Sequence, residues 1–299
     1  MLSYCKVFTM TGEEGLFNAF LVANCVLNAF LSFTAIVFNI IAIQALRKTS
    51  LAKPLKTLLL SLAKSDLGVG FLVQPLYIVV GVGEIRRNSN YNNVINVFII
   101  NSSFFSYASF SYASFFGVVG LTVDGFLAIH LHLVTHKRVV AAVISAWVFS
   151  AFLSIPTEKW IPEEASSGYV VVEAVCIITS GVLYCKIYAT VRRLKNQIHA
   201  LEAQQPAQNG EIANAARLRK TSVATFYVYA AFLACYLPFS CVYPLYYVNS
   251  GKMLKLLLSY TLTLVYLNSS LNPLIYCWKM KHIQQAVLEM LRNTFSNSQ

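Results

Sequence analysis

The stretch that decides the fold is Leu267-Asn268-Ser269-Ser270-Leu271-Asn272-Pro273-Leu274-Ile275-Tyr276, near the C-terminal end of the chain. It places two amides, two hydroxyls and a proline inside a segment that is otherwise apolar enough to span a bilayer. A helix in hydrocarbon tolerates a proline only where neighbouring groups satisfy the backbone carbonyl that the proline leaves without a donor. The asparagines and serines of the run are suited to that role. The run therefore predicts a weakened helix, packed through polar groups, of the kind that bends when a protein changes state.

The composition places the rest of the 299-residue chain in a membrane as well. Hydrophobic residues make up 57% of the sequence, charged residues only 12%, and the mean hydropathy is +0.60. This apolar share is well above that of ordinary globular domains. Seven apolar stretches reach the ~20 residues needed to cross a ~30 Å hydrocarbon core; they cover residues 16–46, 54–82, 94–130, 138–157, 168–191, 222–248 and 254–277. We expect an all-α membrane protein, a seven-transmembrane-helix bundle that forms a single domain over residues 1–299.

Basic residues indicate how the bundle is oriented. Most of the 23 lysines and arginines lie in the first, third and fifth connections and in the C-terminal tail, as in cytoplasmic segments. The N-terminus is therefore expected outside, in a multi-pass protein of the plasma membrane. This asymmetry, facing anionic membrane lipid, explains the net charge of +11, so no nucleic-acid partner is expected. Residues 278–292 place apolar residues at helical spacing beside basic ones, which predicts a short amphipathic helix on the inner membrane surface.

Further markers occur in order on successive stretches: Asn39, Leu62 with Asp66, Trp147, and Pro238 in Cys235-Tyr236-Leu237-Pro238. Together with Asn-Pro-x-x-Tyr at residues 272–276, they resemble the rhodopsin-like (class A) G-protein-coupled receptors across nearly the whole chain. Asn39 matches the asparagine that tethers helices one, two and seven in that family. In two positions the chain is most similar to the melanocortin, cannabinoid and adenosine branch of the family: it has Ile100 in place of a cysteine and Cys176 in place of a proline. The resemblance implies a receptor that senses an extracellular small-molecule or peptide ligand and signals to heterotrimeric G proteins through movement of helices six and seven.

Asp66 is a carboxylate in the middle of an apolar span. A charge there costs on the order of 3 kcal/mol on insertion scales, so its side chain should face the bundle interior. By the resemblance, Ser114, Asn268, Ser269 and Asn272 match the other ligands of the family's sodium pocket. Hard oxygen ligands around one carboxylate suit a small cation, here allosteric Na⁺. The alternative is a protonated Asp66 in a hydrogen-bond network. No other cofactor is expected.

The resemblance also assigns candidate ligand contacts: Tyr107, Ser111, Glu173, Tyr236, Phe239 and Tyr243. Tyr107 stands where amine receptors carry an aspartate, which disfavours a biogenic-amine receptor. Glu173 is open to two interpretations: a counter-ion or hydrogen-bond partner of the ligand, or a protonated acid bonded to a neighbouring helix. Tyr236 replaces the usual tryptophan, so the residue at the pocket floor is smaller and carries a hydroxyl.

An activation switch follows from the same resemblance and consists of Asp124, Gly125, Tyr184, Tyr236, Pro238, Pro273 and Tyr276. The switch differs from the family pattern mainly at Gly125, because the family has arginine directly after the acid that Asp124 matches. Arginine contributes a permanent charge and a rigid five-donor fork that contacts the G protein, and glycine supplies neither. The second cytoplasmic loop is also shorter than the family commonly shows. We therefore expect coupling to the G protein to be weakened.

Two alternatives remain open. Gly125 and the short loop could define a signalling-impaired or decoy receptor of the same fold. A transporter or channel could use Asp66, Lys64 and Glu173 as a charge pathway, but the sequence lacks the inverted repeats or paired broken helices of that class. An enzyme is not expected, because no nucleophile–base or metal-binding constellation occurs at usable spacing.

Overall fold

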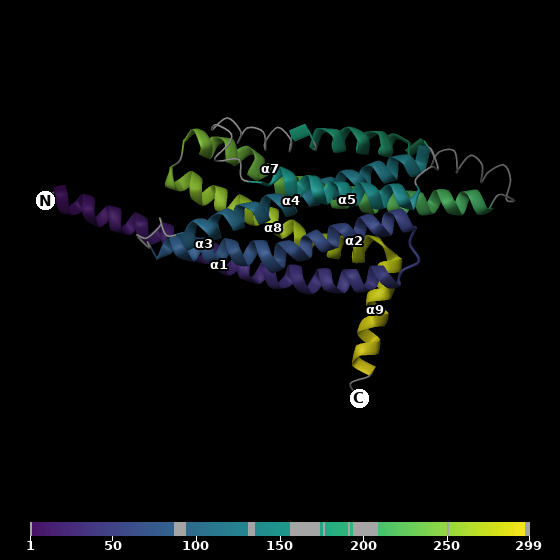
Figure 1. Cartoon of the computed structure of the whole chain (residues 1–299), viewed down its shortest axis with the longest axis horizontal. Coiled ribbons are helices and arrows are strands. Elements are labelled where there is room, and N and C mark those ends of the chain that lie inside the picture. Colours follow the sequence, from purple (N-terminus) through teal and green to yellow (C-terminus); the bar gives the residue numbers. More distant parts are fainter. Residues whose placement is uncertain are drawn as a thin grey trace.

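The computed structural model describes residues 2–86, 94–130, 135–155, 174–175, 177–190, 192–193, 209–249 and 251–296. Its labelled helices are α1 (Leu2–Lys48), α2 (Lys53–Gly68), the π-helix η1 (Val69–Val73), α3 (Gln74–Ile85), α4 (Val94–His130), α5 (His136–Leu153), α7 (Asn209–Val248), α8 (Lys252–Lys279) and α9 (Lys281–Ser296). These described ranges contain no strand. Most helices run along the long axis of the molecule, and α9 crosses that direction at the end opposite the N-terminus (Figure 1). We call this the α9 end of the bundle and the opposite end the N-terminal end.

Five segments of the described chain are long and apolar enough to cross a membrane: Glu14–Lys48, Lys53–Ile85, Phe98–Gly125, His136–Leu153 and Val223–Tyr246. The seventh predicted span is α8, with 28 residues, or about 42 Å of helix. The polar run at 268–272 lowers its hydropathy. Of the predicted span 168–191, the described residues 177–190 are helical. Large apolar side chains such as Phe30, Phe71 and Phe152 are exposed, which suits a surface that faces lipid.

The helices depart from the predicted spans at several places: α1 and α7 begin earlier than predicted, at Leu2 and Asn209, and three further differences occur. The second span contains η1 just before Pro75, and the N–H of Gln74 bonds the carbonyl of Val69, five residues back. Proline lacks the N–H that would continue the regular helical pattern, which explains a π-turn at this position. α5 ends at Leu153, before the predicted residue 157. Met280 has φ −113° and ψ 94°, so α8 continues to residue 279 and the amphipathic helix begins at residue 281 rather than 278.

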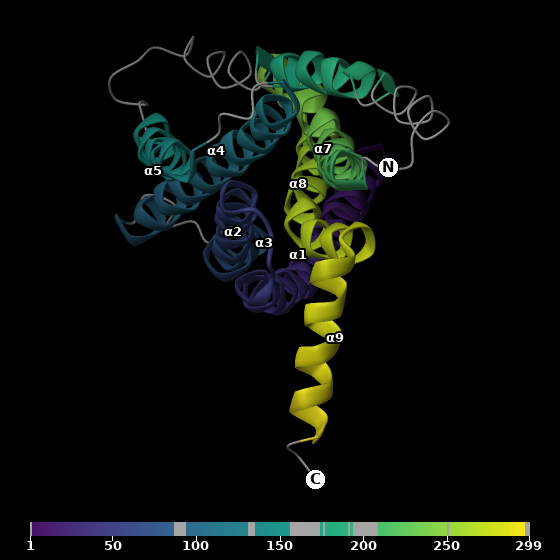
Figure 2. The same ribbon diagram turned by 90° about the vertical axis from the view of Figure 1, so that its right-hand side faces the viewer.

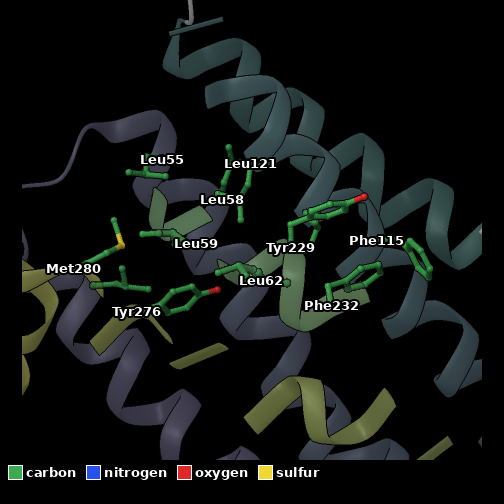
Figure 3. Packing of buried hydrophobic residues seen from close by; sticks show 14 of the residues in the cluster. Leu55, Leu58, Leu59, Leu62, Phe115, Leu121, Tyr229, Phe232, Tyr276 and Met280 are labelled. Atoms are coloured by element: carbon green, nitrogen blue, oxygen red, sulfur yellow. The ribbon is translucent and has the colours of Figure 1, made fainter. Parts of the chain in front are cut away.

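α8 occupies a central place in the bundle. It packs against α1 and α7 and also contacts α2, while α4 packs against α2, α5 and α7 (Figure 2). The main buried cluster includes Leu59 and Leu62 of α2, Phe232 of α7, Tyr276 of α8 and Met280 just after α8 (Figure 3). Between helices surrounded by lipid, van der Waals packing provides much of the attraction. The fit of these side chains therefore holds α2, α7 and α8 together.

Glycines allow two close approaches near η1. A Cβ on Gly68 would lie 2.1 Å from the Phe110 ring, and one on Gly70 would lie 3.0 Å from the Cβ of Ala35. Ser32 also donates to the Gly70 carbonyl over 2.7 Å. A side chain at residue 68 would therefore require the Phe110 ring of α4 to move, and one at residue 70 would press against α1.

α9 has one buried edge and one exposed edge. Ile283 and Ala286 are buried where α9 meets α1 and α8, whereas Leu288 and Leu291 are exposed. Because α9 leaves the bundle sideways (Figure 2), this arrangement is the one that an amphipathic helix on a membrane surface requires.

Candidate functional site

Pro273 leaves the carbonyl of Ser269, four residues earlier, without its helical N–H donor. Asn39 of α1 supplies the replacement. Its Nδ2 donates to the Ser269 carbonyl over 2.8 Å and to the Ala35 carbonyl over 2.9 Å, and its side chain is completely buried. The donor is thus an amide from another helix, whereas the sequence suggested an asparagine or serine of the run itself. This contact joins α1 to α8 where the proline weakens α8.

Asp66 lies at the centre of a buried polar group between α2 and α8. Its side chain is completely buried, and Asn272 Nδ2 donates to Asp66 Oδ2 over 2.8 Å. The hydroxyl of Ser269 lies beside the same carboxylate. A carboxylate in a low-dielectric interior requires such hydrogen bonds. Asp66 therefore faces the interior of the bundle and connects α2 to the proline-containing part of α8.

The other residues matched to the sodium pocket are buried near this group in different ways. Ser114 of α4 pairs with Ser65, with the two hydroxyl oxygens 3.2 Å apart. The side-chain oxygen of Asn268, Oδ1 of Asn272 and Oδ1 of Asp66 have no hydrogen-bond donor among the described residues. Buried acceptors without donors are costly. Carboxylate, amide and hydroxyl oxygens are the ligands that a small hard cation prefers, so the residues present fit such an ion.

Aromatic rings fill the region matched to the ligand pocket. Tyr107 of α4 meets Phe239 of α7 edge to face at 6.1 Å between ring centroids, and Phe239 meets Tyr243 at 5.5 Å. On its other side, Tyr107 meets Tyr266 of α8 at 6.1 Å, and Tyr266 meets Tyr77 of α3 at 5.5 Å. Sequence reasoning missed Tyr266 and Tyr77, because a tyrosine inside an apolar helix does not reveal which way it faces. The five rings form a row from α3 to α7.

Two other candidate ligand contacts lie apart from this row. Ser111 is buried on α4, about one helical turn after Tyr107. Glu173 lies outside the residues that the structure describes.

Tyr236 belongs to a second aromatic group, close to the bend in α7. Its ring stacks on Phe232 at 4.2 Å and meets Phe115 of α4 edge to face at 4.9 Å. Pro238 follows two residues later within α7, and Ser240 donates to the Tyr236 carbonyl over 3.0 Å. A change at Tyr236 would therefore act on both α4 and the proline-weakened part of α7.

A further buried polar cluster lies between α1, α3 and α8 toward the N-terminal end, and the sequence analysis did not single it out. Asn24 and Asn28 donate to the Thr263 hydroxyl over 2.8 and 2.9 Å. Tyr77 donates to Asn24 Oδ1 over 2.8 Å. The spacing of the two asparagines, four residues apart on one helix face, is the signal that could have found them. Because Tyr77 also touches Tyr266, this cluster adjoins the aromatic row.

An apolar side chain lies next to the position of the missing arginine at the α9 end. Asp124 is half-buried on α4. A Cβ on Gly125 would lie 3.7 Å from Cδ1 of Ile187, an ordinary van der Waals contact, and Ile187 itself is buried. The backbone thus accepts a side chain at residue 125, but what it meets first is hydrocarbon.

Tyr184 and Tyr276, two of the three tyrosines in the predicted switch, are not joined to each other in this structure. The Tyr184 hydroxyl donates to the Thr225 carbonyl over 2.9 Å, which links the helical residues 177–190 to α7. The Tyr276 hydroxyl is buried without a hydrogen-bond partner among the described residues. The geometry therefore holds α7 close to the helical residues 177–190.

Comparison with known proteins agrees with this arrangement. The family described as "7 transmembrane receptor (rhodopsin family)" matches residues 158–276. Adenosine receptor A3 of the dog (Canis lupus familiaris) is 24% identical over 85% of this chain and 86% of that receptor. The alpha-1A adrenergic receptor of the rat (Rattus norvegicus) is 25% identical over 59% of this chain and 49% of that receptor. The crystal structure of squid rhodopsin matches with a TM-score of 0.75 at 14% identity, covering 94% of this chain and 88% of that one.

Together, the family match, the related receptors and the structural neighbour support the assignment of this chain as a rhodopsin-like (class A) G-protein-coupled receptor. It is a multi-pass membrane protein with the seven-helix fold of rhodopsin, and its function is that of a G-protein-coupled receptor. Its relatives include both an adenosine and an adrenergic receptor. The similarity therefore defines the family rather than one branch of it.

Proposed function

We propose that this receptor lies in the plasma membrane with its N-terminus outside and binds an uncharged extracellular ligand between α3, α4, α7 and α8. The observation that carries the proposal is the row of rings formed by Tyr77, Tyr266, Tyr107, Phe239 and Tyr243. Ligand sites are typically apolar and aromatic, with a few placed polar groups. Phenol rings offer faces for stacking and hydroxyls for hydrogen bonds, which favours a small molecule or peptide side chain with a flat or apolar body.

The contacts of Tyr236 support a route from this row to the α9 end. Phe239 and Tyr236 lie on α7 on either side of Pro238, and the Tyr236 ring packs on Phe232 and Phe115. A ligand that repacks Phe239 would change the bend of α7. The receptor then shifts toward a population in which the α9 end is open to a G protein.

A binding screen of nucleosides, lipids, peptides and amines on the purified receptor tests the ligand site. Compounds that raise the melting temperature are titrated against Phe239→Ala and against Phe105→Ala, whose ring is 37% exposed on the outside of α4. Phe239→Ala should weaken binding about tenfold or more, on the scale of one lost aromatic contact pair, while Phe105→Ala should leave binding unchanged. Stabilisation by amines alone, or equal binding by both variants, would contradict the proposal.

We also propose that the polar group around Asp66 binds Na⁺, with Asn268, Ser269, Asn272 and Ser114 as neighbouring oxygen ligands. Its support is the set of buried oxygens that have no donor among the described residues. The ion would supply positive charge to the Asp66 carboxylate and so favour the closed packing of α2 against α8. The alternative is a protonated Asp66, which needs no ion.

Melting temperatures in NaCl and in choline chloride of equal concentration separate these two cases. A ligand that binds only the folded state raises stability by RT ln(1 + [L]/Kd), about 1.4 kcal/mol at [L] near ten times Kd. NaCl should therefore stabilise the wild type by several degrees and Asp66→Asn by none. Equal melting in the two salts would favour the protonated form.

A signalling-impaired or decoy receptor remains the second candidate, and Gly125 is the observation that favours it. Arginine at this position would carry a permanent charge, whereas Gly125 meets the apolar Ile187. We propose that the receptor couples to its heterotrimeric G protein weakly because this charge is absent. It acts through binding and conformational change and not as an enzyme.

A further inference from the structure

Three side chains at the α9 end join α7 to α8 and take no part in the groups described above. The ammonium of Lys279 lies 3.9 Å from the ring centroid of Tyr227 and 3.4 Å from that of Trp278. The two rings also meet each other at 5.4 Å with an interplanar angle of 61°. Tyr227 belongs to α7, and Trp278 and Lys279 form the last turn of α8. The contact is thus a bridge between the two helices, which we call the Tyr227–Lys279 clamp.

The charge of Lys279 has no closer electrostatic partner in the described part of the chain. The two described acids at this end, Asp124 and Glu289, form no ion pair with it. A lysine ammonium over the face of tyrosine or tryptophan is attracted by the ring quadrupole, and more strongly where water is partly excluded. Lys279 and Tyr227 are half-buried, whereas Trp278 is exposed and can cover them from the lipid side. Among the described residues, the cation is therefore held by aromatic faces and not by a carboxylate.

The position of Tyr227 makes the clamp sensitive to bending of α7. Tyr227 lies 11 residues before Pro238 on the same helix, or about 16 Å along the axis. A rotation of about 15° at the proline would move Tyr227 by about 4 Å, as much as the present distance between ammonium and ring. The clamp therefore cannot persist when the α9 end of α7 moves outward.

We propose that the Tyr227–Lys279 clamp holds the receptor in its closed conformation and takes the place of the arginine contact that Gly125 cannot make. Lys279 acts as a positioning residue, because it restrains α7 through Tyr227 and touches no ligand. The proposal rests on the proposed function in one respect, namely that α7 moves outward when the receptor is active. Removing the aromatic face or the charge should raise the population of the open conformation.

Spin-label distances measure this population without a ligand or a G protein. The labels are placed at Val223→Cys on α7 and Lys137→Cys on α5, two exposed positions, after the native accessible cysteines are changed to serine. The receptor is studied as the full chain in lipid nanodiscs. Tyr227→Leu and Lys279→Met should each raise the long-distance fraction about fivefold, the scale of one cation–π contact.

Conservative variants distinguish the clamp from a general packing effect. Tyr227→Phe keeps the ring and Lys279→Arg keeps the cation, so both should retain the wild-type distance distribution. Lys281→Met, which removes a neighbouring charge on α9, should also have no effect. Wild-type distances in Tyr227→Leu and Lys279→Met would overturn the proposal, as would equal opening in Tyr227→Phe and Tyr227→Leu.

Nucleotide exchange on a purified heterotrimeric G protein is the second readout. Variants that open the bundle should raise basal exchange in the Gly125→Arg background. If distances respond but no variant promotes exchange, the clamp stands and the coupling part of the proposed function fails. If exchange occurs but the distances do not respond, the clamp is wrong and the receptor function stands.

Discussion

The two acids Asp66 and Asp124 lie in the same bundle in opposite kinds of surroundings. Asp66 accepts a hydrogen bond from Asn272 and lies beside Ser269, whose carbonyl is in turn bonded by Asn39. Asp124 is followed by Gly125, which faces the apolar Ile187. The interior that would link ligand binding to helix movement therefore keeps its polar contacts. At the end that would meet the G protein, Gly125 contributes no charge, and the neighbour of its backbone is the apolar Ile187.

The largest expected effect comes from removing the carboxylate at the centre of the polar interior. Asp66→Leu leaves the Asn272 amide and the Ser269 hydroxyl without their acceptor and should cost about 2 to 3 kcal/mol of unfolding free energy. Thermal unfolding in sodium-free buffer measures it. Asp66→Asn keeps an acceptor oxygen and should lose less than half as much. Equal stability of Asp66→Leu and wild type would show that the polar contacts do not support the interior.

A smaller loss is expected from Asn39→Ala. The variant leaves the Ser269 carbonyl without a donor beside Pro273, and interhelical hydrogen bonds in membranes contribute about 0.6 to 1.7 kcal/mol each. The expected decrease is about 1 to 2 kcal/mol in the same unfolding assay. Thr34→Val, which removes a partly buried hydroxyl pair with Ser270 on the same two helices, is the matched control and should cost less. A larger loss of stability in Thr34→Val than in Asn39→Ala would mean that the Asn39 hydrogen bond is not the main polar contact between α1 and α8.

Gly125→Ala should stabilise the receptor by up to about 1 kcal/mol, since alanine is the better helix former and its Cβ finds an ordinary contact at 3.7 Å. Gly120→Ala on the same helix provides a matched comparison. Its Cβ would lie 3.0 Å from Cδ2 of Leu58, so the gain should be smaller or reversed. A melting temperature that falls in Gly125→Ala would show that the apolar contact at this end does not tolerate a side chain.

The smallest effect is expected outside both regions, at Trp147. Its Nε1 donates to the Ser61 hydroxyl over 2.9 Å, and its ring meets Phe110 at 5.8 Å. Trp147→Phe keeps an aromatic ring and removes the donor, so the cost should be about 0.6 kcal/mol. A double-mutant cycle with Ser61→Ala isolates the hydrogen bond. Strict additivity of the two changes would mean that the bond contributes nothing.

The sequence predicted the elements of the polar interior because buried polar groups are conspicuous in an apolar chain. The predicted span 94–130 has the same bounds as α4, Val94–His130. Asp66 faces inward as the cost of a lipid-exposed charge requires. The carbonyl freed by Pro273 was predicted to need a donor, and it has one. These features follow from rules that apply along a single helix.

Contacts between distant helices were harder to predict. The composition of the run at 268–272 suggested donors within α8, while the donor comes from Asn39, 230 residues away. Only the family resemblance, and not the run itself, indicated that Asn39 reaches the seventh helix. Tyr77, Tyr266 and Tyr227 gave no signal, because an apolar helix surrounded by others has no polar face that fixes its rotation. The break at Met280, which assigns Lys279 to α8, depends on backbone angles and is also invisible in the sequence.

The central claim is that the receptor combines an intact polar interior with a weakened G-protein contact. It is tested most directly by measuring G-protein nucleotide exchange with receptor variants at residue 125. Wild type, Gly125→Ala and Gly125→Arg are compared in nanodiscs with the same purified heterotrimeric G protein. A charge-assisted hydrogen bond contributes about 1.5 to 3 kcal/mol, so Gly125→Arg should exchange nucleotide at least about tenfold faster than wild type. Gly125→Ala should equal wild type. Fast exchange by wild type that arginine does not increase would contradict the account.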